Sequence, residues 1–335
     1  MLKVEEPMGL LDFLRDYLDA NNITHHGQVR TDDLAGWFRA WFQVPAFARL
    51  TELEDLCARL GVPVHHRAVG SDELLAVNMW YDGAEPTIVL RPDGVTVRLE
   101  HSLCHELREV IENGFKRVKP EYVGIDTNDN KAMNPESDQF ASCLLMPPAE
   151  SKQLLRSLGY DLLAFAHETS RALPSIILRT QHLLSSKSEE GPAAGIWLYE
   201  TPWELVRQGR ARPSDLVVRY DARLRGFSLD KNATAETKLA RLVFPGKQAR
   251  AMDAPIVLRA VAEGRTVLES IRGFDLWGER DFEIICEPLF VKGAIWRVLL
   301  AAVRRDCLDM IQPWMDRING PASRAAVSLG GASGR

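Results

Sequence analysis

The sequence lacks the cysteine patterns that mark disulfide frameworks and cysteine-based zinc sites. Its five cysteines are odd in number, widely scattered and set among apolar residues: Cys57, Cys104, Cys143, Cys286 and Cys307. It contains no CxxC pair, the spacing that supplies ligands to many structural zinc sites. We therefore expect reduced, buried thiols rather than disulfides.

Long hydrophobic runs and a large charge imbalance are also missing. The longest apolar runs, such as the one that ends at Val303, are far shorter than the ~20 residues that cross a bilayer. With 41 Lys and Arg against 46 Asp and Glu, the net charge is −5, which favours neither a polyanion nor a membrane as default partner. The N-terminus has acidic residues before its first apolar stretch and no typical cleavage site. These absences predict a cytoplasmic location.

The length of 335 residues and the 46% hydrophobic content predict about two domains. Helical periodicity in residues 8–60 is followed by short strand patterns with turn signals, which predict a small antiparallel sheet. The polar segment 185–195 is the best linker candidate. Beyond it, strand and helix patterns alternate, so we expect an α+β protein with a mainly helical first domain and an α+β second domain.

Two predicted helices contain the residues most suited to chemistry. In the first, apolar residues recur at helical spacing between Leu99 and Ile111, and Gly114 can end the helix. The second begins at the Asn-Pro pair 134–135 and runs to Met146, after a long polar loop. Helices joined in this way can form the two sides of a site.

On the first of these helices, His101, His105 and Glu109 are spaced four residues apart and share one stripe. Glu106 follows His105 directly. An imidazole ligand beside a free carboxylate can hold a metal ion and deprotonate the water bound to it. The same spacing also fits a solvated polar face with two incidental histidines, so both interpretations stay open.

Together, the CHELRE run and the later NPESDQFASCLLMP run resemble the ImmA/IrrE-type metallopeptidases. The second run matches that family at Phe140, Ala141 and residues 144–147, and the resemblance covers residues 51–186. It implies a zincin-like module with a helix-turn-helix-like segment at about 150–186, preceded by a helical extension, residues 1–50. It also implies a Zn²⁺-dependent endopeptidase that cleaves a DNA-binding transcriptional repressor, in a stress response or in the control of a mobile element.

Carried over residue by residue, the resemblance implies that His105 is the first metal ligand and Glu106 the general base. The second ligand position holds Glu109 instead of a histidine. The position of the third ligand holds Asn134, a poor zinc ligand, whereas Asp138 lies one turn further along the same helix face. We therefore expect the metal ligands His105, Glu109 and Asp138.

His101 and Glu136 are alternates for the metal site. A carboxylate-rich set with one imidazole shifts the preference from Zn²⁺ toward Mn²⁺ or another divalent ion, or weakens metal binding altogether. Two hypotheses follow. The chain is either an active metallopeptidase or a catalytically degenerate, metal-poor regulator that docks a repressor or senses a small ligand.

Residues 187–320 resemble a GAF-type sensor domain through a helix that ends in glycine, an apolar strand and a C-x-P-L-x-V-x-G strand and turn. This resemblance implies a small ligand, with Trp277, Phe282 and Cys286 as candidate lining residues, although such residues in strands are more often core. We expect a disordered tail at 321–335. Direct DNA binding is the minor interpretation, and four side chains of the helix-turn-helix-like segment are its candidates: Arg171, Arg179, Gln181 and His182.

Overall fold

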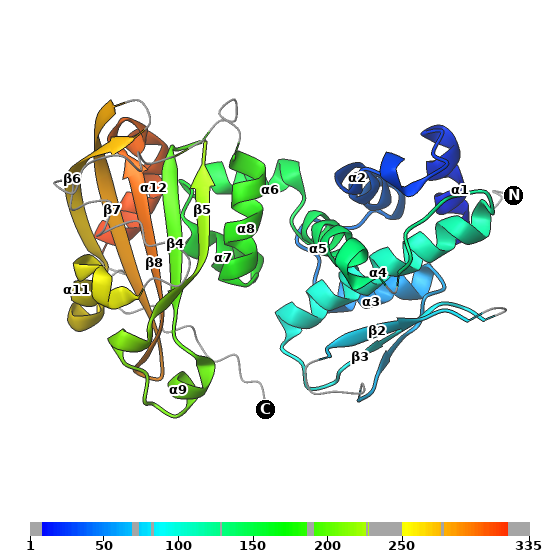
Figure 1. Ribbon diagram of the computed structural model, residues 1–335, viewed down its shortest axis with the longest axis horizontal. Helices are drawn as coiled ribbons and strands as arrows, with labels where there is room; N and C mark the ends of the chain where they lie inside the picture. The colour runs from blue at the N-terminus through cyan, green and yellow to red at the C-terminus, as the bar shows by residue number, and fades with distance from the viewer. Residues whose placement is uncertain are drawn as a thin grey trace, which may run out of the picture. The chain divides into compact units, whose positions relative to one another are not determined.

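The computed structural model describes residues 9–68, 74–81, 84–127, 129–185, 191–225, 227, 250–275 and 278–320. The fold is α+β, as predicted, and it divides into two compact units (Figure 1). The N-terminal unit extends to Ser151 and the C-terminal unit begins at Lys152. This division falls earlier in the chain than the segment 185–195 that the sequence indicates as a linker. No helix in the described part of the chain is long and apolar enough to cross a membrane.

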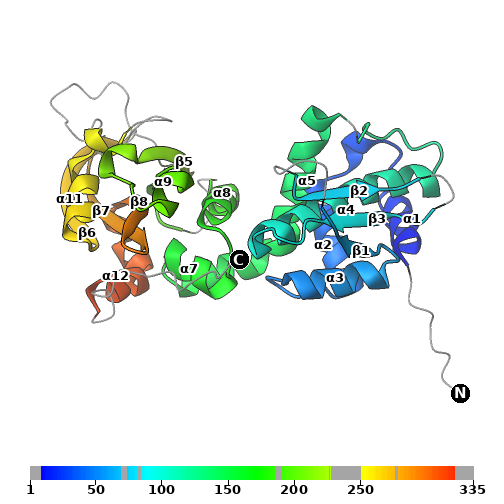
Figure 2. The same cartoon turned by 90° about the horizontal axis from the view of Figure 1, so that it is seen from below.

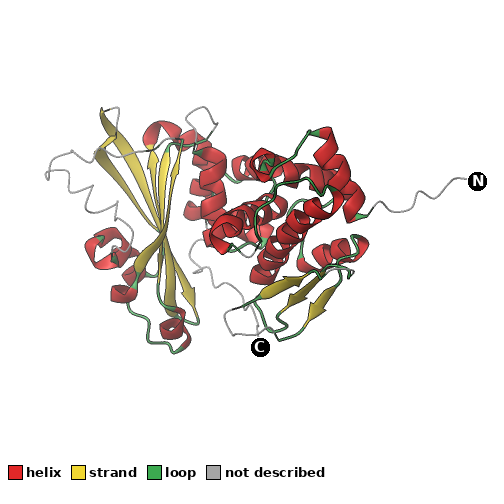
Figure 3. Cartoon of the chain, turned by 45° about the vertical axis from the view of Figure 1, so that its right-hand side comes forward, coloured by secondary structure: helices red, strands yellow, loops and turns green. Residues whose placement is uncertain are grey.

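The N-terminal unit packs helices on one another and on a small sheet (Figure 3). One hydrophobic core joins residues of all five helices, so the first two helices are part of the same packed body. The helices are α1 (Leu10–Ala20), α2 (Thr31–Phe42), α3 (Leu50–Arg59), α4 (Thr96–Val118) and α5 (Asn130–Leu145), and the strands are β1 (Val64–His66), β2 (Ala76–Met79) and β3 (Thr87–Leu90).

The small sheet is mixed, which corrects the expected antiparallel arrangement. Its strand order is β1-β3-β2. Strand β2 runs antiparallel to β3, but β1 is parallel to β3. A parallel pair needs a long crossover connection, and the segment that contains β2 provides it by passing to the far edge of the sheet.

Helix α4 has the predicted apolar face: Leu103, Val110 and Ile111 are fully buried. It continues beyond Gly114, where the sequence indicated an end. A Cβ atom at Gly114 would collide with Leu14 of α1, so this glycine allows two helices to approach closely and does not cap α4.

Helix α5 begins about one turn earlier than predicted. Asp129 is its N-cap, and its side chain accepts a hydrogen bond from the backbone N–H of Lys131. Pro135 therefore lies inside the helix instead of opening it. The helix ends at Leu145, and α6 (Pro148–Ser157) follows after the predicted proline stop.

The C-terminal unit is an antiparallel five-stranded sheet between two helical layers. The strand order is β5-β4-β8-β7-β6. Figure 2 shows α11 on one side of this sheet and α7 and α8 on the other. The strands are β4 (Ala194–Glu200), β5 (Val217–Leu224), β6 (Val267–Asp275), β7 (Gly278–Val291) and β8 (Ala294–Arg304), and the helices are α7 (Leu162–Thr169), α8 (Leu173–Leu184), α9 (Trp203–Arg207), α11 (Pro255–Glu263) and α12 (Gln312–Asn319).

Strand β8 is buried on both faces, as a central strand between two layers requires. Val298, Leu300 and Ala302 belong to the core that includes residues of α11, and the alternate residues of the strand are equally buried on the opposite face. Helix α8 packs against β5. The helix-turn-helix-like pair therefore belongs to the C-terminal unit by its contacts.

Arg171 and Arg179 do not face solvent, which corrects their assignment as candidate DNA contacts. Arg171, just before α8, is 6% exposed, and Arg179, on α8, is 3% exposed. Of the other two candidates, Gln181 is half-buried and His182 is exposed. Of the four candidate DNA contacts, the two arginines are therefore buried, and only Gln181 and His182 are accessible to solvent.

Candidate functional site

His105 lies between two carboxylates that come from two helices. Its Nδ1 atom is 3.0 Å from Oδ1 of Asp138 on α5, and its Nε2 atom is 3.4 Å from Oε1 of Glu109, one turn further along α4. The His105 and Glu109 side chains are largely buried, whereas that of Asp138 is 62% exposed. The structure thus brings together the three residues expected as metal ligands, and it arranges them around the imidazole ring.

His101 lies on the same stripe of α4, as its spacing predicts. Its ring centroid is 6.5 Å from that of His105, and its Nε2 atom is 3.9 Å from Oδ1 of Asp138. Asp138 therefore faces both histidines from the neighbouring helix. This position makes Asp138 the link between α5 and the polar stripe of α4.

Asn78, on β2, holds the two glutamates of the site. The Oε2 atom of Glu106 accepts hydrogen bonds from the backbone N and Nδ2 of Asn78, at 2.9 and 2.7 Å. The same Nδ2 donates to Oε2 of Glu109 at 2.7 Å. Sequence reasoning missed Asn78, because only the packing of an edge strand against α4 reveals its role. The His105 cluster denotes His105, Glu106, Glu109, Asp138 and Asn78.

The cluster holds a positive ring among negative groups. Burial lowers the pKa of His105, but the hydrogen bonds with Asp138 and Glu109 and the charge of Glu106 outweigh it and raise the pKa to about 10. Burial raises the pKa of Asp138, but the bond with His105 and the charge of His101 lower it below its ordinary value. A raised pKa favours the protonated ring, whose Nδ1–H then donates to Asp138 while Nε2 faces Glu109.

The pKa of Glu106 is raised, unlike that of Asp138, which is lowered. Burial and, to a lesser extent, the charge of Glu109 raise its pKa, while the hydrogen bond from Asn78 and the charge of His105 act against this rise. A raised pKa suits a carboxylate that exchanges protons. Buried structural carboxylates show the same tendency, so this feature alone does not assign a reaction.

Glu136 and Asn134, the alternate ligands on α5, are placed differently. Glu136 accepts a hydrogen bond from the hydroxyl of Thr31 on α2. Two residues along a helix differ by about 200° in direction, so Glu136 and Asp138 face different neighbours. Asn134 lies one turn before Asp138 and is exposed.

The donor set can be tested for a zinc ion. Two ligands of a tetrahedral zinc lie about 3.3 Å apart, and the 3.4 Å between Nε2 of His105 and Oε1 of Glu109 agrees with this. Asp138 is bonded to the other ring nitrogen, which faces away from that point. It occupies the place of an outer carboxylate that orients a histidine, not of a third ligand. The residues present therefore supply two of the three ligands that a catalytic zinc needs.

No group of three or more His, Cys, Asp or Glu side chains that could hold a metal ion is found in the described ranges. The predicted ligand set of His105, Glu109 and Asp138 stays a prediction. In the arrangement described, this set lacks a third ligand on the same side of the ring.

Glu112, three residues after Glu109, forms a second polar network that sequence reasoning missed. The side chains of Arg108 and Glu112 are both fully buried, and Nη1 of Arg108 donates to Glu112 at 3.0 Å. Glu112 also bonds Nδ1 of His26 at 3.2 Å, the Tyr122 hydroxyl at 3.1 Å and the backbone N of Ile125 at 3.0 Å. The bonds from Tyr122 and Ile125 attach the loop that leads from α4 to α5, and the bond from His26 attaches the segment after α1. The signal in the sequence was an i, i+4 charge pair on the apolar face of a helix.

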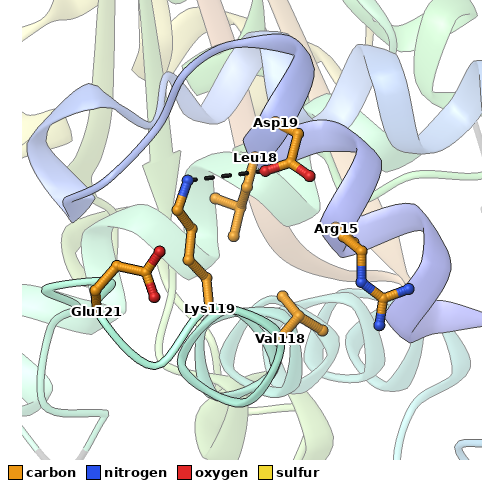
Figure 4. A pocket seen from close by; sticks show the side chains of 6 residues that line it. All are labelled: Arg15, Leu18, Asp19, Val118, Lys119 and Glu121. Atoms are coloured by element: carbon orange, nitrogen blue, oxygen red, sulfur yellow. Dashed lines mark ion pairs between the residues drawn. The ribbon is translucent and has the colours of Figure 1, made fainter.

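A shallow cavity of about 240 Å³ lies at the C-terminal end of α4 (Figure 4). It is lined by Arg15, Leu18 and Asp19 of α1 and by Val118, Lys119 and Glu121. Lys119 Nζ is 3.8 Å from Asp19 Oδ1. Because α4 rises about 1.5 Å per residue, this cavity is ~20 Å from His105 and is separate from the cluster.

The candidate ligand-pocket residues of the C-terminal unit are part of its core. Phe282 and Cys286 are fully buried, and the ring of Phe282 packs at 5.9 Å against that of Phe227. Trp277 lies outside the described residues. The pocket stays a prediction, and the core interpretation accounts for both described residues.

No protein family model and no curated protein matches the sequence. A solved structure described as a Mycobacterium tuberculosis transcriptional regulator is similar, with a TM-score of 0.50 and 12% sequence identity. The similarity covers 90% of this chain and 97% of that chain. At this level of identity, it concerns the fold alone.

Proposed function

We propose that this chain is a regulator of transcription that works by binding a DNA-binding regulatory protein, without proteolysis. The observation that carries the proposal is the engagement of both His105 nitrogens by carboxylates, from Glu109 on one side and Asp138 on the other. Each ring nitrogen faces a carboxylate, so a metal ion would have to replace the proton that His105 shares with Glu109 before the ring could act as a ligand. The chain is then an ImmA/IrrE-like protein in which a charged cluster takes the place of the metal site.

The cluster has a structural task in this proposal. Asp138 on α5 bonds to His105 on α4, and Asn78 joins β2 to Glu106 and Glu109. Three elements that a metal site would hold together are thus held by hydrogen bonds and ion pairs. Charge-assisted hydrogen bonds are the stronger kind, which suits this role.

The C-terminal unit supports a sensing role. Its strand order and its helical layers on both faces agree with a GAF-like domain, for which we propose a small ligand as signal. The name of the similar solved structure, a transcriptional regulator, supports a role in transcription, because the similarity extends over most of both chains. The proposed partner is a helix-turn-helix repressor, which the chain would bind in response to that signal.

A metal-dependent endopeptidase is the second candidate, and one observation favours it. The Nε2 atom of His105 and the Oε1 atom of Glu109 have the separation of two zinc ligands, and Glu106 lies beside them with a raised pKa. His105, Glu109 and a carboxylate of α5 would then hold Zn²⁺ or Mn²⁺, which would supply an acidified water beside Glu106.

The Glu106→Gln variant distinguishes the two candidates, since glutamine cannot act as a general base but can still accept hydrogen bonds from Asn78. In the host organism, a deletion strain complemented with this variant is expected to restore the same transcript profile as one complemented with wild type. RNA sequencing measures the profile, and an immunoblot of the co-purified regulator shows whether it is intact. Glu121→Gln, at an exposed position, serves as the control.

Loss of regulation in the Glu106→Gln strain, together with accumulation of an uncleaved regulator that wild type converts to fragments, would establish the endopeptidase instead.

A further inference from the structure

Two tryptophans and an arginine form a row at one end of the second sheet, where α9 follows β4 (Figure 1). Trp203, the first residue of α9, is 51% exposed. Its ring centroid is 5.9 Å from that of Trp296 on β8, with the ring planes at 62°. The guanidinium of Arg297 covers the Trp296 ring at 3.9 Å from its centroid. Trp203 is thus fixed from one side and open to solvent on the other.

Three exposed arginines follow Trp203 within ten residues of the chain: Arg207, Arg210 and Arg212. Arg207 lies four residues after Trp203 on α9, and therefore on the same side of the helix. Arg210 follows a reversal at Gly209, and its backbone N bonds to the carbonyl of Leu205, which brings it back over α9.

The charge of this segment is opposite to that of the whole chain. Residues 203–212 contain three arginines and one acidic residue, Glu204, which gives +2 in a protein whose net charge is −5. No ion pair within the described ranges involves Arg207, Arg210 or Arg212, whereas Arg297 pairs with Glu200 at 2.6 Å. Among the described residues, the positive charge of these three arginines is thus not neutralised by a carboxylate.

We infer that Trp203, Trp296, Arg207, Arg210 and Arg212, here named the Trp203 surface, dock an acidic protein segment that carries an apolar anchor residue. Tryptophan and arginine are the residue types that most often dominate protein–protein binding energies. The exposed ring offers contact area to the anchor, and the arginines complement negative side chains around it.

Single-stranded nucleic acid is the other polyanion that such residue types attract. It needs open, successive ring faces on which bases stack. On the Trp203 surface, Arg297 already covers a face of Trp296, and the two rings meet edge to face. Only one ring remains open, which fits a single anchoring side chain better than a run of bases.

The inference does not depend on whether the His105 cluster holds a metal, and it adds a partner-binding surface in the C-terminal unit.

The probe is a fluorescein-labelled acidic peptide of glutamates with one central phenylalanine. Fluorescence anisotropy at low salt measures its binding to the full chain. We expect saturable binding that weakens as salt rises, and about a tenfold weaker affinity for Trp203→Ala and for Arg207→Glu.

Arg98→Glu, an exposed position on α4, makes the same charge change outside the surface and is expected to bind like wild type. Equal thermal melting curves confirm that the variants fold. As a second readout, the 5-fluorotryptophan resonance of Trp203, assigned with Trp203→Phe, is expected to shift when the peptide is added.

Three outcomes would overturn the inference: no binding to wild type, an equal loss in Arg98→Glu and Arg207→Glu, or a Trp203-dependent preference for oligodeoxythymidine over the peptide. The last outcome would assign the surface to nucleic acid.

Discussion

Replacing Arg317 with methionine is expected to lower the free energy of unfolding of the C-terminal unit by about 3–5 kcal/mol. Nη2 of Arg317 donates to both carboxylate oxygens of Glu287, at 2.9 and 2.8 Å, and its Nε donates to Asp161. Glu287 and Asp161 are 3% and 1% exposed. Without the guanidinium, two buried carboxylates would remain with no cation between them.

This ion pair connects three elements of the C-terminal unit. Glu287 lies on β7, Arg317 and Trp314 on α12, and Asp161 is the N-cap of α7, where it accepts hydrogen bonds from Leu163 and Ala164. Trp314 donates to the same Glu287 at 2.8 Å. Removing the Arg317 guanidinium is therefore expected to destabilise α12 and the start of α7 together.

Native-state hydrogen exchange of the β7 and β8 amides measures this effect, because it reports the opening free energy of one unit. Arg272→Met is the matched control on the same sheet. Arg272 pairs with Asp281, but both side chains are exposed, and such a pair contributes about 0.5 kcal/mol or less. If Arg317→Met and Arg272→Met lowered the opening free energy equally, the ion pairs of Arg317 with Glu287 and Asp161 would not stabilise the C-terminal unit.

The second large effect is expected at Glu112. Burial would raise the pKa of its carboxyl, but the hydrogen bond with His26 and the charge of Arg108 outweigh it and lower the pKa from 4.5 to about 2. At about 1.36 kcal/mol per pKa unit, this shift corresponds to about 3 kcal/mol of the free energy of unfolding of the N-terminal unit. We expect Glu112→Gln to lose about that amount at neutral pH.

The sign of the pH dependence follows from the lowered pKa. The stabilisation is complete above pH 4.5, where the unfolded carboxyl is also ionised, and it is lost as the pH falls toward about 2. The free energy of unfolding of wild type is therefore expected to fall by about 3 kcal/mol across this interval. The Glu112→Gln variant is expected to lack this pH-dependent decrease.

Urea unfolding at pH 7 and at pH 3, followed by hydrogen exchange of α4 amides, tests the difference. Glu121→Gln is the exposed control. If wild type and Glu112→Gln showed parallel pH profiles, the four bonds to Glu112 would not account for the stability of the loop between α4 and α5.

Local pattern was enough to predict the helices that carry the site. The apolar spacing in α4 placed His101, His105 and Glu109 on one stripe, whereas Asp138 was expected beside them only through the resemblance to the metallopeptidases; the structure has Asp138 near both histidines. What pattern did not predict is which ring nitrogen each carboxylate meets. That depends on the distance and rotation between α4 and α5, which the packing of the whole unit sets.

The other features that the sequence did not predict depend on contacts between segments far apart in the chain. Asn78 reaches Glu106 across 28 positions and His26 reaches Glu112 across 86, and neither residue stands out in its own segment. Gly114 has the appearance of a helix end in the sequence, but the approach of Leu14 explains it. The strand order of the C-terminal unit likewise depends on pairings between segments far apart in the chain.

The central claim is that the His105 cluster works without a metal ion, and calorimetric titration of zinc into the purified chain tests it most directly. The comparison is with the double variant Glu109→His/Asn134→Glu, which supplies the two ligands that the resemblance to the metallopeptidases implies. We expect one zinc bound per chain in the double variant and no stoichiometric uptake in wild type. Wild-type uptake of one zinc per chain, abolished by His105→Ala, would contradict the claim.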